Sequence, residues 1–140
     1  MKLRMFLTSV LCLALCAFLG GCLTAADYED IYNDDARIAT CSTNVMVGSV
    51  KSGIGSEYKW SCSSFSGVYP IKDVKSSADV NLSLNIESGK FKIVAVNGND
   101  VYTLAEGGFD GKVDFSKMPS GSYTIKAVGV EAEFSLKLTY

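Results

Sequence analysis

Few residues of this chain could take part in catalysis. The sequence has no histidine, which excludes the commonest general base and the catalytic triads built on imidazole. Serines are numerous, but Ser61 and Ser63 have no Gly-x-Ser-x-Gly motif around them. The carboxylates of Asp110 and Asp114 could serve glycoside hydrolysis only if they lay about 5–10 Å apart across a cleft. We therefore expect a non-catalytic protein with no cofactor and no metal.

The charge balance argues against a nucleic-acid partner. Lys and Arg number 13 against 15 Asp and Glu, a formal net charge of −2. No stretch gathers Lys and Arg into the basic patch that nucleic-acid binding requires. We expect no nucleic acid among the partners of this chain.

The N-terminus has the organisation of an export signal. Two positive charges, Lys2 and Arg4, precede an apolar run at residues 5–19, and small residues follow. A basic start, an apolar centre and a small-residue cleavage site define a secretory signal peptide. The alternative is an uncut transmembrane helix, which needs about 20 apolar residues and would have to include Gly20 and Gly21.

The residues at the expected cleavage site are Leu19-Gly20-Gly21-Cys22, and this tetrapeptide resembles the lipobox of bacterial lipoproteins. The resemblance implies that residues 1–21 are removed and that Cys22 becomes a lipidated N-terminus. Stable membrane attachment generally needs more than one acyl chain, a condition that a multiply acylated lipoprotein meets. We expect a lipid-anchored protein of the cell envelope that faces outside the cytoplasm, in the outer membrane where two membranes are present.

Cys41 and Cys62 remain once Cys12 and Cys16 leave with the signal peptide and Cys22 carries the lipid. Outside the cytoplasm, such a pair is expected to form a disulfide. Closing a loop of about 20 residues would stabilise the fold by roughly 3 kcal/mol. A zinc site would need about four nitrogen or sulfur ligands, more than these two cysteines supply.

The segment 22–40, which would follow the lipid, is rich in carboxylates. Its acidic residues are Asp27, Glu29, Asp30, Asp34 and Asp35. Since Arg37 alone opposes them, self-repulsion predicts an extended, solvated tether. Two alternatives stay open, a calcium site built from the carboxylates and a short helix that packs on the domain through Tyr28, Ile31 and Tyr32.

From residue 41 to the end, the apolar pattern has a period of two. Val80, Leu82, Leu84 and Ile86 alternate with polar residues, which is typical of strands with one face in a core. Glycine-containing turns such as Asn97-Gly98 separate the strands. The expected strands are residues 45–50, 57–63, 67–74, 80–86, 91–96, 101–104, 112–115, 122–127 and 133–140. We predict one all-β domain over residues 41–140, a single antiparallel β-sandwich of Ig-like or jelly-roll-like form with seven to nine strands.

Two resemblances concern the second half of the chain. Its strands beginning Ser88-Gly89-Lys90-Phe91 and Gly121-Ser122-Tyr123 resemble those of small exported bacterial β-sandwich lipoproteins, which implies a fold and a location but no ligand. The tetrapeptide Ser120-Gly121-Ser122-Tyr123 is similar, with one residue fewer, to a loop of small lipid-anchored lysozyme inhibitors. That likeness implies a hydrolase inhibitor as an alternative function, beside a protective structural lipoprotein.

An aromatic cluster supplies the candidate ligand-binding residues, Tyr58, Trp60 and Tyr69. Exposed rings of this kind could stack on sugar faces or anchor a protein partner. The alternative is core packing, because Tyr58 and Trp60 share a strand face with Cys62, and a tryptophan beside a disulfide is familiar in sandwich cores. Tyr69 is expected nearer to an edge. The function we expect is a binding module for cell-wall glycan or for an envelope or host protein.

Overall fold

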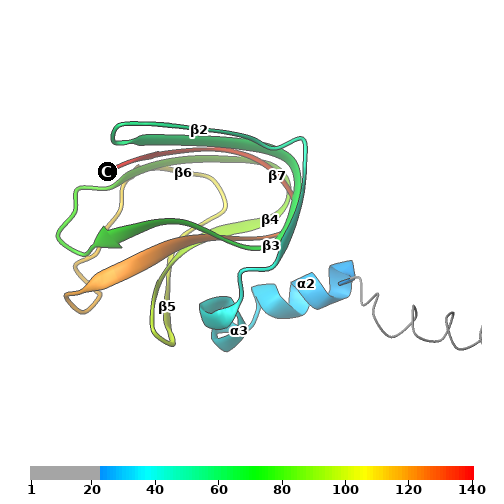
Figure 1. Cartoon of the computed structure of the whole chain (residues 1–140), viewed down its shortest axis with the longest axis horizontal. Coiled ribbons are helices and arrows are strands. Elements are labelled where there is room, and N and C mark those ends of the chain that lie inside the picture. Colours follow the sequence, from blue (N-terminus) through cyan, green and yellow to red (C-terminus); the bar gives the residue numbers. More distant parts are fainter. Residues whose placement is uncertain (1–22) are drawn as a thin grey trace, which may run out of the picture.

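The structure, a computed structural model, describes residues 23–140, so the predicted signal peptide and Cys22 lie outside the described residues. Two short helices precede seven strands (Figure 1). The helices are α2 (Ala25–Tyr32) and α3 (Asp35–Thr40). The strands are β1 (Asn44–Val47), β2 (Val50–Ile54), β3 (Glu57–Lys75), β4 (Asn81–Asn97), β5 (Asp100–Glu106), β6 (Phe109–Lys112) and β7 (Ser122–Thr139).

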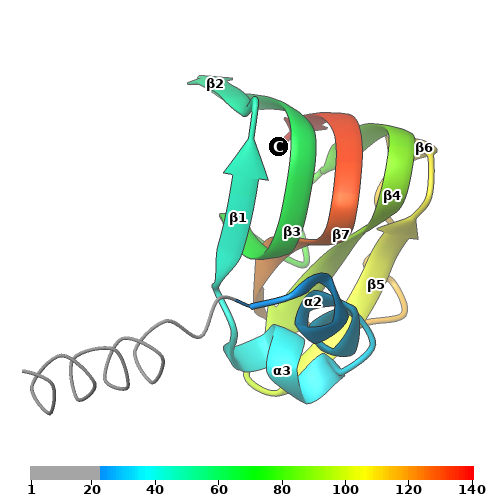
Figure 2. The same cartoon turned by 90° about the vertical axis from the view of Figure 1, so that its right-hand side faces the viewer.

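All seven strands belong to one antiparallel sheet that bends over on itself. Its main path is β1-β3-β7-β4-β5, while β2 pairs with β3 and β6 pairs with β4. Strands β3, β4 and β7 each run through both layers of the molecule (Figures 1 and 2). The upper layer of Figure 1 holds β2, β6 and residues 57–64, 81–87 and 132–139, and the lower layer holds β5 and residues 67–75, 91–97 and 122–129.

The bend occurs at the same level in all three long strands. The pairing of β3 with β7 changes register around Phe65, and that of β4 with β7 changes around Ser88. Gly67 and Gly89 have φ angles of +114° and +74°, which glycine adopts without steric cost. A Cβ at Gly67 would lie 2.2 Å from the Thr43 carbonyl oxygen, so only glycine lets β1 approach the bend this closely. Bulges of this kind curve a sheet sharply.

The prediction of an all-β, antiparallel, sandwich-like fold is confirmed, with seven strands. The two layers are halves of one open sheet, because expected strands merge across the bend. Residues 57–63 and 67–74 are both part of β3, and β4 and β7 each unite two expected strands in the same way. Ser88-Gly89 lies within β4 at the bend, whereas Asn97-Gly98 does connect two strands, β4 and β5.

The main core fills the space between the two layers. Its centre is a group of aromatic rings, in which Phe91 and Phe134 stack at 4.0 Å between centroids and Trp60 meets Phe134 edge-on at 4.8 Å. Phe65, at the bend, contacts Trp60, Phe91 and Phe134. Offset and edge-to-face pairs of this kind stabilise a core beyond the burial of their area. The aromatic centre therefore holds the bend and both layers together.

A second core covers the outer face of the lower layer. Helices α2 and α3 lie under that layer (Figures 1 and 2). Their buried side chains are Tyr28, Ile31, Tyr32 and Ile38, and these pack on Val68, Val94, Val96, Val128 and Val130 of the sheet. The expectation of an extended, solvated tether at residues 22–40 is therefore wrong for residues 25–40, which form two packed helices. The apolar residues at helical spacing outweigh the charge repulsion because the sheet offers them an apolar face.

The carboxylates that suggested a tether have local roles at the helix ends. The Asp27 carboxylate accepts hydrogen bonds from the backbone N–H and the hydroxyl of Thr24, in a capping box that begins α2. Asp34 is the N-cap of α3, where its side chain accepts the N–H of Arg37 at 3.2 Å. Glu29 forms an ion pair with Lys90 of the sheet. These partners offset the repulsion, and they leave no cluster for a calcium ion in the described residues.

A buried lysine joins the helices to the sheet. The ammonium of Lys126, on β7, donates to the carbonyl oxygens of Ile38 at 3.0 Å, Ala39 at 2.9 Å and Cys41 at 3.1 Å. These carbonyls end α3, where a positive charge is favourable. Burial lowers the pKa of Lys126, yet the three acceptors satisfy all of its donors. Lys126 thereby holds the C-terminal end of α3 against the lower layer.

The predicted disulfide between Cys41 and Cys62 is not formed, and both cysteines are free thiols. Cys62 points into the main core, where its thiol donates weakly to the Val47 and Ser64 carbonyl oxygens. Cys41 follows α3 and packs against the second core, on the other face of the sheet. A disulfide needs its two Cα atoms within about 7 Å and its Cβ atoms facing each other. The sheet itself separates the two sulfur atoms.

The helix cover gives the first prediction. Ile38 is fully buried (0% exposed) between α3 and the sheet, whereas Ile54, on β2, is 85% exposed. Ile38→Ala should lower the free energy of unfolding by about 2–5 kcal/mol, and Ile54→Ala should change it by less than about 0.5 kcal/mol. Urea denaturation of residues 23–140, which hold both cores complete, measures the difference. Equal stability of the two variants would contradict a packed α3.

Candidate functional site

The predicted aromatic residues lie at the open edge of the main core, not in an exposed row. Trp60 is 1% exposed, and its ring N–H donates to the Ser49 hydroxyl at 2.9 Å. Tyr58 and Tyr69 are half-buried against the same core. The expectation that Tyr58, Trp60 and Cys62 share one inward strand face is confirmed. Tyr69 reaches the edge, as expected, but its ring packs on Trp60 at 5.1 Å between centroids.

Two lysines cover the aromatic rings at this edge. The Lys51 ammonium lies 3.6 Å from the ring centroid of Tyr69 and 4.7 Å from that of Trp60. Lys72 lies 4.6 Å from the ring centroid of Tyr140. Such contacts are attractive, because the face of an aromatic ring carries negative potential. A sugar stacking on Tyr69 or Trp60 from this side would therefore have to displace Lys51.

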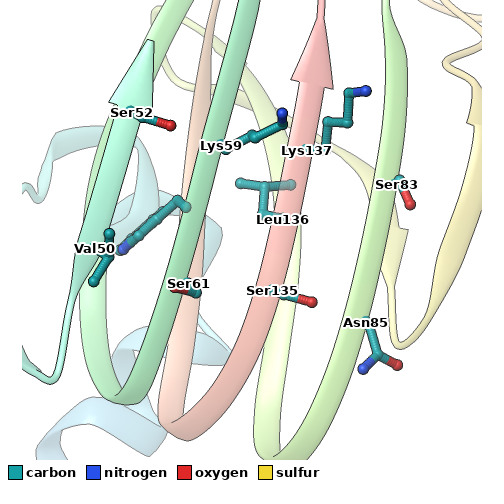
Figure 3. Close-up of a pocket in the computed structure, with 10 residues that line it drawn as sticks. Val50, Ser52, Lys59, Ser61, Ser83, Asn85, Ser135, Leu136 and Lys137 are labelled. Carbon is teal, nitrogen blue, oxygen red and sulfur yellow. The ribbon is translucent and has the colours of Figure 1, made fainter.

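A different surface, the outer face of the upper layer, presents a row of small polar groups. We call this surface the polar face and define it by Lys59, Ser61, Ser83, Asn85, Ser135 and Lys137 (Figure 3). These residues come from three neighbouring strands, β3, β7 and β4, and line a hollow of about 340 Å³. Val50 and Ser52 of β2 extend it on one side (Figure 3).

Strand register arranges the polar face in two lines across the sheet. Ser61 pairs with Ser135, which pairs with Asn85. Two residues away along each strand, on the same face, Lys59 pairs with Lys137, which pairs with Ser83. Alternate residues of a strand point to opposite faces of the sheet. The leucines of β4 and β7 therefore point into the core, and the polar residues between them point outward and meet on the polar face. The hollow exists because the serine side chains are short, and the longer lysine side chains form its border.

A single carboxylate holds the two lysines in place. Lys59 and Lys137 are directly opposite each other, an arrangement that is unfavourable for like charges. The Glu57 carboxylate binds Lys59 at 2.7 Å and Lys137 at 2.9 Å. Hydrogen bonds from Lys59 and then Lys137 lower the pKa of Glu57 to about 2. Two further carboxylates border the polar face, since Glu87 accepts from the Asn85 amide and Asp110 is paired with Ser83. The positive charge of the polar face is therefore local to Lys59 and Lys137.

The two carboxylates considered for catalysis do not line the same hollow. Asp110 borders a hollow shared with Asn81 and Lys137, and Asp114 borders different ones. The side chain of Asp114 accepts the N–H of Ser116 at 2.8 Å, and hydrogen bonding to Ser116 lowers the pKa of Asp114. Within residues 23–140, no group of three or more Cys, Asp or Glu side chains could hold a metal ion.

One spacing in the sequence matches a nucleophile motif, Ser56-Glu57-Tyr58-Lys59 for Ser-x-x-Lys. In that motif the lysine must act on the serine hydroxyl. Here the Lys59 ammonium binds Glu57 at 2.7 Å, and the four residues run from a turn into an extended strand. The arrangement does not supply a base for Ser56.

The Glu57 ion pairs give an acid-dependent prediction. Because the pKa of Glu57 is about 2 in the folded chain against an ordinary 4.5, its contribution to stability is present above pH 4.5 and lost as the pH falls towards 2. Glu57→Gln should therefore flatten the pH dependence of the free energy of unfolding over that range. Urea denaturation at several pH values measures it, with the exposed Asp30→Asn as control. An unchanged slope in Glu57→Gln would contradict the two ion pairs.

Comparisons with known proteins leave the chain without an assigned relative. No protein-family model, no curated protein and no solved structure matches it. In the part of the chain that the structure describes, neither helix is long and apolar enough to cross a membrane.

Proposed function

We propose that this chain is a lipid-anchored, non-catalytic protein of the bacterial cell envelope that binds cell-wall glycan through the polar face. Two features support the proposal. The first is the lipobox-like sequence that ends at Cys22. The second is the concave line of hydroxyl and amide groups over three strands, which has the chemistry of a surface for polar ligands.

The position of the polar face carries the proposal. A lipid at Cys22 would precede α2 by two residues, Leu23 and Thr24. Helices α2 and α3 cover the outer face of the lower layer, whereas the polar face is the outer face of the upper layer (Figure 1). A chain held to a membrane near α2 would therefore present the polar face on the opposite side of the sheet from its helix cover.

The chemistry of the polar face suits a carbohydrate. Ser61, Ser135 and Asn85 each offer donors and acceptors of hydrogen bonds, as do the hydroxyl and acetamido groups of a glycan. The ammonium groups of Lys59 and Lys137 lie together at one end of the polar face, where they would attract the carboxylates attached to cell-wall sugars. The neutral serines impose no net charge on the rest of the ligand.

The hydrolase-inhibitor alternative has less support. Its motif would need the loop at Ser120 to present Tyr123 to an enzyme. Tyr123 is 2% exposed, and its hydroxyl donates to the Pro119 carbonyl oxygen at 2.6 Å. The N–H of Gly121 donates to the Ser76 hydroxyl at 3.0 Å. The tyrosine belongs to the core, and the loop is bound to the neighbouring turn.

The anchor is tested by metabolic labelling. The full chain, expressed in a bacterial host, should incorporate a clickable palmitate analogue and partition into the detergent phase. Cys22→Ser should lose the palmitate label, because the sulfur that receives the lipid is absent. Cys41→Ser is the matched control and should keep the label. Label retained in Cys22→Ser would exclude Cys22 as the lipidation site.

Glycan binding is tested by co-sedimentation of residues 23–140 with protein-free peptidoglycan and with purified cell-wall polysaccharide. Ser135→Arg places a long side chain in the middle of the hollow and should weaken binding by at least about tenfold, equivalent to roughly 1.4 kcal/mol. Ser116→Arg, in an exposed loop, should bind as the parent does. Tyr69→Ala alters the aromatic edge and leaves the polar face intact, so it shows which of the two surfaces binds the glycan.

Circular dichroism confirms that each variant is folded. No saturable binding by the parent chain would remove glycan as the ligand. Binding that Tyr69→Ala weakens and Ser135→Arg preserves would move the site to the aromatic edge covered by Lys51.

A further inference from the structure

A second hollow opens where the two layers part, between β5 and β6. Strand β5 pairs with β4 in the lower layer, and β6 pairs with β4 in the upper layer. No pairing joins β5 to β6 in the described residues. The hollow between them has a volume of about 480 Å³, within the usual size of small-molecule sites. It is on a different face of the molecule from the polar face.

The floor of this hollow is an exposed part of the main core. Tyr102, Leu104, Phe109 and Met118 line it, are half-buried and pack against the core cluster. The fully buried Val113 completes the apolar floor. Side chains of this kind normally avoid water, and a methionine adapts its shape to different apolar ligands. The floor therefore suits a flexible hydrocarbon chain.

The border of the hollow is polar and mostly positive. Lys112 and Lys117 line it with a single carboxylate, Asp114, and that carboxylate already accepts the Ser116 N–H. Lys112 forms one ion pair, with Asp79 at 3.0 Å, in which both side chains are largely exposed. Such a pair contributes little to stability, so the Lys112 ammonium is available to another anion.

We propose that the hollow between β5 and β6 binds the acyl chain of a free fatty acid, with the hydrocarbon on Leu104, Phe109 and Met118 and the carboxylate at Lys112 and Lys117. The two lysines favour an anionic head over a neutral or cationic one. This site is independent of the polar face and of any glycan bound there. It would give the protein a second, apolar ligand.

Methionine methyl groups provide the test. The sequence has four methionines, of which Met46 and Met118 lie in residues 23–140. Met118 lines the hollow, whereas Met46 is on β1, at the opposite edge of the sheet. Residues 23–140 labelled at the methionine methyl carbons are titrated with decanoate below its micelle concentration. We expect a saturable shift of the Met118 signal and an unchanged Met46 signal.

The head group is tested with a matched pair of variants. Lys112→Gln with Lys117→Gln should weaken decanoate binding by about tenfold, while Lys59→Gln with Lys137→Gln on the polar face makes the same charge change and should leave it unaltered. Decanol and decyltrimethylammonium should bind more weakly than decanoate to the parent chain. A Met118 signal that does not shift, or that shifts together with Met46, would overturn the site. Equal binding of the three decyl compounds would overturn the fatty-acid assignment.

Discussion

The rest of the structure depends on the bend shared by β3, β4 and β7. These strands are long enough to form a flat ribbon, and a flat ribbon would leave its aromatic face in water. The bend brings the two halves of that face together, so that Phe65, Phe91 and Phe134 contact one another. Gly67 and Gly89 are required at the bend, since a Cβ there would lie 2.2 Å from the Thr43 oxygen and 2.3 Å from the Glu131 oxygen, respectively. Backbone geometry and aromatic packing thus depend on each other, because neither would persist alone.

The bend also gives the two outer faces different roles. The lower outer face is apolar at Val68, Val94 and Val128, and it is buried only because α2 and α3 pack on it. In the upper layer, buried and exposed residues alternate along β3, β4 and β7, so the outer face there carries serine, asparagine and lysine side chains. A single strand such as β7 therefore changes its pattern at the bend, from buried on both faces near Val128 to buried on one face near Leu136. The stretch of β7 in which every residue is buried is the half of the strand that α2 and α3 cover.

The long strands were predictable from period-two alternation, and Asn97-Gly98 was predictable as a connection between two strands. The expected strands 45–50 and 112–115 were wrong in their bounds, since a turn separates β1 from β2 and β6 ends at Lys112. The bend was not predictable, because Ser88-Gly89 has the composition of a hairpin turn and only the partner strands show that the chain continues. A short helix packed through Tyr28, Ile31 and Tyr32 was the alternative to the tether, and α2 confirms it. The tether was preferred because the acidic residues of 27–35 suggest repulsion, while their caps and the ion pair of Glu29 with Lys90 depend on the folded chain. The disulfide was wrong for a similar reason, since spacing does not show which face of the sheet each cysteine occupies. The polar face combines residues from three strands that are far apart in sequence, so sequence spacing could not assemble it.

The same arrangement limits where a ligand could bind. The interior is filled by aromatic rings, the lower outer face is covered by α2 and α3, and the edge at Trp60 is covered by Lys51. The polar face and the gap between β5 and β6 stay open, and they differ in chemistry because they are built from different strands, the first mainly from β3, β4 and β7 and the second from β5, β6 and the residues that follow β6. The first collects the outward side chains of the upper layer, and the second exposes inward side chains where pairing ends. An anchor beside α2 would add to the helix cover and leave both of these surfaces free, which is why an N-terminal lipid and a binding role are compatible in one small domain.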